Sequence, residues 1–115
     1  LEVSVPQPPL DGLFRKSIQP FLISWFAYEP SEEMARIEGA VLIVNGTTDI
    51  QVSVTEAKNL HKSLPGSELY IVEGMNHALK DAPIDRMENI KVYSDSTKPL
   101  TNGLVDEISA FLLSE

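Results

Sequence analysis

The chain has 115 residues, enough for one domain of modest size, with 17 acidic against 9 basic residues and a formal net charge of −8. That charge repels phosphate backbones and anionic lipid, and no basic stripe offsets it, so we expect no nucleic acid and no membrane as partners. Cysteine is absent, which excludes disulfides, zinc fingers and a thiol nucleophile, and no apolar run approaches the roughly 18 residues that span a bilayer.

The first segment of the chain is rich in proline. Pro6, Pro8 and Pro9 block the hydrogen bonds of helices and sheets, so residues 1–12 are predicted to form an extended linker. This opening lacks the cationic start and apolar centre of a signal peptide. Because the chain begins at Leu1 within such a segment, we expect it to be a piece of a longer protein.

An aromatic-rich stretch follows the linker. Phe21, Leu22, Trp25 and Phe26 would share one face of a short helix, which Pro20 can begin at its first position. An apolar stripe is the ordinary means by which a helix docks, so we expect this face to pack on the rest of the protein. A mobile lid over a substrate pocket is the alternative.

A second short helix is predicted from Pro30, with Glu32 and Glu33 near its positive end and Gly39 as its stop. Residues 40–44 then form an apolar run that ends in a Gly-containing turn, which is typical of a buried strand.

A further helix is predicted to start at Ser53, which stands three residues before Glu56 in the spacing of a capping box. Its apolar stripe ends at Pro65 and Gly66, and a second strand, residues 68–72, comes directly after. The succession of strand, helix and strand predicts a βαβ unit with parallel strands. His61 falls at the margin of the stripe and is expected to be a half-buried boundary residue.

The remainder of the chain is less regular. Within the polar stretch 80–99, Ile90, Val92 and Tyr93 suggest a short irregular strand. Leu104 and Ile108 mark the start of an amphipathic pattern that predicts a final helix.

Asp49 and His77 follow the two predicted strands and lie 28 positions apart, which is one βαβ step. The carboxyl ends of neighbouring parallel strands meet at one edge of the sheet, where such folds bind ligands. A carboxylate that holds an imidazole in one tautomer makes it a general base, so this pair supplies two members of a nucleophile–base–acid triad. In the alternative interpretation, Asp49 caps the turn into the next helix and His77 is a loop histidine.

Other chemistry has little support in the sequence. The loop 46–49 lacks the lysine and glycine spacing of a phosphate-binding loop, and the two histidines lack the spacing of a zinc site. We therefore expect no cofactor and no metal. No Gly-x-Ser-x-Gly occurs in these residues, so the nucleophile of a triad is missing.

Residues 41–52 resemble the strand and acid loop of α/β-hydrolase-fold proteins, and residues 74–77 resemble their histidine loop. The resemblance is to the serine-hydrolase branch, near the esterase, lipase and serine aminopeptidase groups, and it covers about residues 20–80 well. It implies an α/β fold, namely the C-terminal part of the hydrolase core with an incomplete sheet. Residues 1–38 would be linker and helices from the junction of cap and core, and residues 39–115 the C-terminal part of the core.

The resemblance also implies a function. Asp49 would be the orienting acid and His77 the general base in hydrolysis of a small-molecule ester, amide or thioester by acyl transfer. The chain departs from the family at Gly39-Ala40, where a proline is usual, and lacks the serine elbow and oxyanion-hole loop. The alternative is a non-catalytic α/β binding or interaction domain. We also expect self-association through exposed strand edges, because a truncated sheet leaves an edge uncovered.

Overall fold

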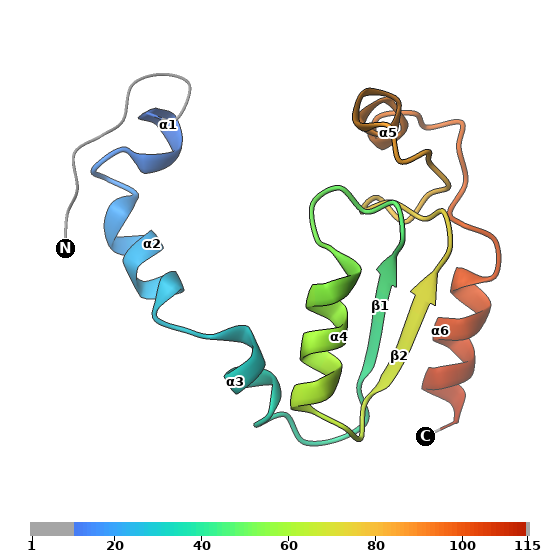
Figure 1. The fold of residues 1–115 in the computed structure, drawn as a ribbon, viewed down its shortest axis with the longest axis horizontal. Coiled ribbons are helices and arrows are strands. Elements are labelled where there is room, and N and C mark those ends of the chain that lie inside the picture. Colours follow the sequence, from blue (N-terminus) through green and yellow to red (C-terminus); the bar gives the residue numbers. More distant parts are fainter. Residues whose placement is uncertain (1–10, 115) are drawn as a thin grey trace.

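The computed structural model describes residues 11–114 and is of mixed α/β class (Figure 1). Residues 1–10 of the predicted linker lie outside the described part, and residues 11 and 12 belong to a short helix. In chain order the elements are α1 (Asp11–Phe14), α2 (Gln19–Phe26), α3 (Pro30–Met34), β1 (Leu42–Gly46), α4 (Val54–Ser63), β2 (Glu68–Val72), α5 (Arg86–Tyr93) and α6 (Leu104–Leu113).

The predicted βαβ unit is confirmed. β1 and β2 are parallel and in register from Leu42 opposite Glu68 to Gly46 opposite Val72, with α4 between them in sequence. β2 has the predicted bounds, whereas β1 begins and ends two residues later than predicted. The reason is the partner strand: the N–H of Thr47 donates to the carbonyl of Val72, which extends the ladder past the apolar run.

Helices cover both faces of the two strands. Figure 1 shows α4 and α6 on opposite sides of β1 and β2. Val72, Met75 and Leu104 form a buried apolar cluster, on which Val44 and Ile108 also pack. Side chains alternate between the faces of a strand, so Asn45, next to Val44, faces away from this cluster. The core thus holds both strands and the loop that follows β2 against α6.

The start of α4 lies where the sequence predicted, but the capping box does not form. Ser53 is the N-cap residue, and its side chain makes no capping hydrogen bond. The N–H of Glu56 donates instead to the backbone carbonyl of Ser53, at 3.0 Å. In a capping box the hydroxyl of Ser53 would accept a hydrogen bond from the N–H of Glu56. Here that N–H is already used by the backbone carbonyl in a tight first turn.

The strand suggested around Ile90 and Val92 is wrong, because these residues lie in α5. The side chain of Asp85 caps this helix by accepting from the N–H of Glu88, at 3.0 Å. Asn89 and Val92, three positions apart, are the buried residues of the helix. In Figure 1, α5 lies beyond the carboxyl ends of both strands. It therefore approaches the loops that carry Asp49 and His77.

The expectation that the aromatic face of α2 packs on the protein is also wrong for the described residues. α2 begins at Gln19, one residue before the predicted start at Pro20. Phe21, Trp25 and Phe26 are exposed by 57%, 64% and 73%. α1 and α2 form an arm away from the strands (Figure 1). The radius of gyration, 17.5 Å, exceeds the roughly 13 Å of a compact chain of this length. α3, the next helix, contacts α4 of the βαβ unit.

α3 begins at Pro30, as predicted, and ends at Met34, ahead of the predicted stop. The final helix, α6, is confirmed, with Gly103 in a left-handed conformation as its N-cap. Across residues 11–114, no helix combines the length and apolar character needed to cross a membrane.

Candidate active site

Asp49 and His77 lie in the loops that follow β1 and β2. Gly46 and Val72, the last residues of the strands, are opposite each other in the ladder, so both loops leave the sheet at the same level. The N–H of Thr48 donates to the carbonyl of Met75 at 3.2 Å, and the N–H of Gly74 donates to Thr47 Oγ1 at 2.8 Å. These two bonds hold the acid loop and the histidine loop side by side.

The structure brings the predicted pair together: His77 Nδ1 lies 2.9 Å from Asp49 Oδ2. An ionised carboxylate can only accept hydrogen bonds, so the proton of this bond belongs to Nδ1. In the neutral imidazole that tautomer leaves a lone pair on Nε2. The contact is therefore present, and the catalytic role of the two residues stays a prediction.

Asp49 also caps the turn that leads toward α4, which was the alternative interpretation of this residue. Its other oxygen, Oδ1, accepts from the N–H of Gln51 at 2.8 Å and of Val52 at 2.9 Å. The carboxylate therefore orders its own loop with one oxygen and orients His77 with the other. The Asp49 side chain is only 5% exposed, so the carboxylate itself is largely shielded from solvent.

The hydrogen bonds keep Asp49 ionised. Burial by itself would raise the pKa of this carboxyl, but the N–H of Val52, the His77 ring and the N–H of Gln51 outweigh it and lower the pKa below its ordinary value. An ionised acid at neutral pH is what the tautomer argument requires.

His77 is accessible on its other side. Its side chain is 45% exposed, and Nε2 makes no hydrogen bond to any residue within 11–114. An imidazole that is fixed at Nδ1 and open at Nε2 can take a proton from an incoming group at Nε2.

The histidine loop contains the one non-glycine residue with positive φ in the described chain, Leu79, at φ 62°. The carbonyl of Leu79 accepts from the N–H of Thr101, and its N–H donates to the carbonyl of Asn76, at 2.9 and 3.0 Å. A left-handed non-glycine residue costs about 1–3 kcal/mol and persists only where surrounding contacts hold it. Here those contacts lie two residues from His77.

A hollow of about 180 Å³ lies against the pair, and Asn45, Val52, Met75 and Leu79 are among the residues that line it. Asn45 Nδ2 donates to the carbonyl of Val52, and its buried Oδ1 has no hydrogen-bond partner in the described part of the chain. Pockets that bind small molecules usually measure about 300–1,000 Å³. The hollow is therefore too small to be a complete site.

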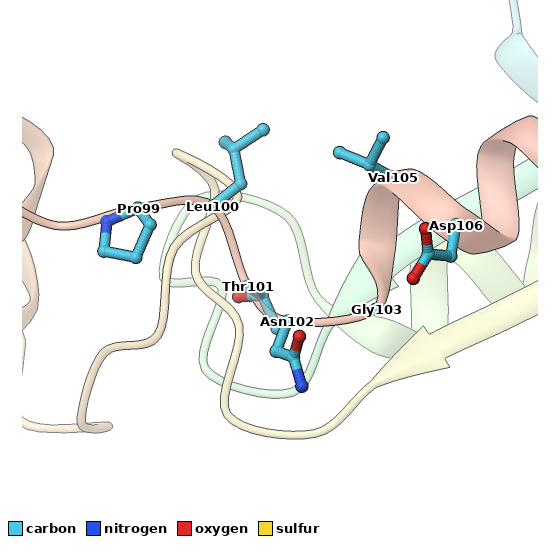
Figure 2. Close-up of a pocket in the computed structure, with 7 residues that line it drawn as sticks. All are labelled: Pro99, Leu100, Thr101, Asn102, Gly103, Val105 and Asp106. Carbon is cyan, nitrogen blue, oxygen red and sulfur yellow. The ribbon is translucent and has the colours of Figure 1, made fainter.

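A larger hollow, about 370 Å³, lies along the segment that leads into α6. Figure 2 shows Leu100 and Val105 on one side of this segment and Asn102 on the other. Asp106 is the only titratable residue among those that line it. It belongs to the first turn of α6, whereas Asp49 and His77 lie in the loops after β1 and β2. Its lining offers no acid–base pair, so we do not assign it a reaction.

His61, the second histidine, bonds Ser67 Oγ through Nδ1 at 2.8 Å and is partly buried, as predicted for a boundary residue. This pair joins the end of α4 to the start of β2, at the opposite end of the strands from His77. Among residues 11–114, no group of three or more His, Cys, Asp or Glu side chains is placed to hold a metal ion.

Sequence reasoning missed the asparagines around the pair. Asn76, directly before His77, is 1% exposed, and Asn89 in α5 is fully buried. Buried polar side chains have no periodic signature, and Asn89 stood in the polar stretch 80–99, directly before the residues interpreted as a strand. The only signal was that Asn76 precedes the candidate base.

The lowered pKa of Asp49 predicts a pH dependence of stability. A carboxyl whose pKa is depressed on folding stabilises the folded chain fully above its unfolded pKa of about 4, and loses that contribution as the pH falls through the folded value. At pH 7 we expect the free energy of unfolding of Asp49→Asn to be about 1.5–3 kcal/mol lower than that of the parent chain. This difference should shrink below about pH 4, as measured by urea unfolding at pH 7, 5, 4 and 3.

Glu68→Gln is the control for this measurement, because Glu68 is exposed and lies at the opposite end of β2. Its difference from the parent chain should stay near zero throughout. An Asp49→Asn difference of the same size at pH 7 and pH 3 would contradict the assignment.

Comparison with known proteins does not place the chain: a scan against protein-family models and a search of the curated proteins both returned no match.

Proposed function

We propose that this chain is the C-terminal part of an α/β-hydrolase-fold enzyme and supplies the acid and the histidine of its catalytic triad. The observation that carries the proposal is the oriented pair: Asp49 accepts from His77 Nδ1 at 2.9 Å, and Nε2 is left open. The order of the pair, acid after one strand and histidine after the next, is also the order of these two members in that family.

The proposed reaction is hydrolysis of an ester, amide or thioester of a small molecule by acyl transfer. A serine outside these residues attacks the carbonyl carbon, and His77 Nε2 takes the hydroxyl proton as the new C–O bond forms. The imidazolium then returns that proton to the leaving group as its bond to the carbonyl carbon breaks. Water, deprotonated by His77 in its turn, then attacks the acyl-serine and releases the carboxylic acid and the free serine. Asp49 stays ionised throughout, stabilises the imidazolium and keeps the ring in its tautomer.

The described residues do not contain the whole machinery. No serine within 11–114 hydrogen-bonds His77 Nε2, and the adjoining hollow of about 180 Å³ does not enclose a substrate. The nucleophile, the oxyanion hole and the remainder of the pocket would come from other residues of the complete protein. An acid–base pair without them brings no covalent step, so we predict that the 115-residue chain alone is inactive.

A fluorophosphonate probe tests this proposal, because it reacts with an activated serine. The full translation product of the gene should be labelled at a serine, and His77→Ala should remove the labelling. The 115-residue chain should show neither labelling nor ester hydrolysis. An unlabelled, folded full-length product would favour the alternative, a non-catalytic binding domain. Ester hydrolysis by the short chain that His77→Ala abolishes would refute the claim that the chain is incomplete.

Self-association through strand edges is a separate proposal. In the described sheet, β1 and β2 pair only with each other, so each has one unpaired edge that can accept another strand. We expect light scattering of the 115-residue chain to show a molar mass that rises with concentration. A monomer across the whole concentration range would contradict the proposal.

Two variants locate the contact. The N–H of Glu68 donates to the carbonyl of Val41, directly before β1, so alternation directs the N–H of Leu69 to the outer edge. Leu69→Pro should therefore weaken association, because it removes an edge donor without removing a β1–β2 bond. Trp25→Ser is the comparison. If that variant alone yields a monomer, the exposed aromatic face of α2 makes the contact and the strand edges do not.

A further inference from the structure

We infer that Asn89 is a positioning residue, which holds the acid loop and the histidine loop at the separation that the Asp49–His77 hydrogen bond requires. Asn89 lies in the middle of α5 and is completely buried, with an exposed fraction of 0%. The inference deepens the proposed function, but its structural part concerns only the contact between two side chains.

One amide touches the residue that precedes each member of the pair. Asn89 Nδ2 donates to the carbonyl of Thr48, directly before Asp49, at 2.8 Å. Asn89 Oδ1 accepts from Asn76 Nδ2, directly before His77, at 3.3 Å. Nδ2 also donates to the carbonyl of Pro83 at 2.8 Å. The side chain of Asn89 therefore joins α5 to both loops at once.

The orientation of the two amides is determined by their partners. Both N–H groups of Asn89 Nδ2 face carbonyl oxygens, which can only accept, so the oxygen of this amide must face Asn76. Asn76 Oδ1 accepts from the N–H groups of Ala78 and Lys80, at 3.0 and 3.2 Å. Because every donor of Asn89 is used in a buried site, breaking one leaves an unsatisfied group, which is costly.

The network matters because the contact that it supports tolerates little displacement. His77 Nδ1 and Asp49 Oδ2 are 2.9 Å apart, the length of a strong hydrogen bond. If one loop moved by well under 1 Å relative to the other, the two atoms would be beyond hydrogen-bond range. The Thr48–Met75 backbone bond and the Gly74–Thr47 bond connect the loops close to the sheet. Asn89 connects them from the α5 side, so the pair is braced from two directions.

A second link between α5 and the acid loop provides a control. Gln51 Nε2 donates to Tyr93 Oη at 3.0 Å, and this bond is exposed and touches only one loop. An exposed hydrogen bond competes with water and contributes little. Ser67→Ala is the control for lost stability, because it removes a partly buried hydrogen bond to His61 at the opposite end of the strands.

The test is NMR of the His77 ring in the 115-residue chain with ¹⁵N-labelled histidine. In the parent chain we expect a downfield Nδ1–H proton, protected from exchange, and ring nitrogen shifts of the Nδ1–H tautomer. Asn89→Asp keeps the shape of the side chain but turns an acceptor toward Thr48 and Pro83. It should abolish the protected proton and move the ring to a mixture of tautomers. Asn76→Asp, which turns an acceptor toward Asn89 Oδ1 but leaves the bonds to Thr48 and Pro83 in place, should weaken the signal less.

The controls separate positioning from stability. Tyr93→Phe and Ser67→Ala should keep the parent His77 signal, although Ser67→Ala should lower the melting temperature. A parent-like signal in folded Asn89→Asp, or equal loss of the signal in Ser67→Ala, would overturn the inference. A measurement on the parent chain needs no variant: on warming, the Asn89 side-chain amide protons and the His77 proton should lose protection together. Persistence of the His77 signal after the Asn89 amide exchanges would also overturn it.

The catalytic consequence is tested separately. In an active full-length protein, Asn89→Asp should lower kcat/KM by on the order of 10²-fold, as expected when a base is displaced by about 1 Å, and Tyr93→Phe should not. If the NMR result holds and the full-length protein has no activity, the positioning inference survives and the proposed function fails. If activity exists but Asn89→Asp leaves both the signal and kcat/KM unchanged, only the positioning inference fails.

Discussion

Replacement of His77 by alanine in the full-length protein is expected to lower kcat by on the order of 10⁶-fold, because no other group then takes the proton of the attacking hydroxyl. Asp49→Asn should cost less, on the order of 10⁴-fold, since the imidazole is still present but loses its tautomer. Both variants should leave KM nearly unchanged if the pair acts mainly in the transition state. Initial rates with an activated ester such as a p-nitrophenyl ester measure these effects.

His61→Ala is the matched control, because it removes the chain's other histidine and one hydrogen bond of similar length. We expect its kcat to equal that of the parent protein. If His61→Ala and His77→Ala lowered kcat equally, both substitutions would act by destabilising the protein. A catalytic role for His77 would then lose its support.

Gly46→Ala is expected to destabilise the chain by about 3 kcal/mol or more. A Cβ atom at Gly46 would overlap the backbone carbonyl of Met75, which cannot rotate away as a side-chain end could. The same carbonyl accepts the N–H of Thr48, so the overlap would also separate the two loops that carry the candidate pair. Urea unfolding measures the free energy, and the Nδ1–H signal of His77 reports the separation.

Gly66→Ala is the control for this prediction, since a Cβ there meets no atom within 4 Å and Gly66 does not have positive φ. Its free energy of unfolding should stay level or rise by about 0.4–1 kcal/mol, because alanine restricts the unfolded chain. If the two alanine variants unfold at the same urea concentration, the close approach of the loops is not a constraint on the fold.

Much of the βαβ unit could be predicted from the residues alone. Apolar runs bounded by turn residues locate both strands, and Ser53 and Pro65 bound the helix between them, because these signals are local. The meeting of Asp49 and His77 also followed without coordinates. Once two parallel strands are neighbours, the loops at their carboxyl ends share one edge of the sheet.

Other features could not be predicted because they depend on which segments, distant in sequence, pack against a given element. The last residues of β1 join the ladder through β2, not through their own strand propensity. The stretch around Val92 has apolar residues compatible with either a strand or a helix, and the cap at Asp85 together with burial of one face makes it a helix. The aromatic residues of α2 have a docking pattern, yet no described element covers them.

The sequence by itself determined the two strands, the connecting helix and the meeting of Asp49 with His77, because periodicity, turn residues and spacing along the chain suffice for these. Only the tertiary structure decided how the pair is held: which oxygen of Asp49 binds His77, and that Asn89 reaches both loops from α5. Asn89 lies 41 positions from Thr48 and 13 from Asn76, and contacts between buried amides so far apart in sequence arise only when packing places the elements around them.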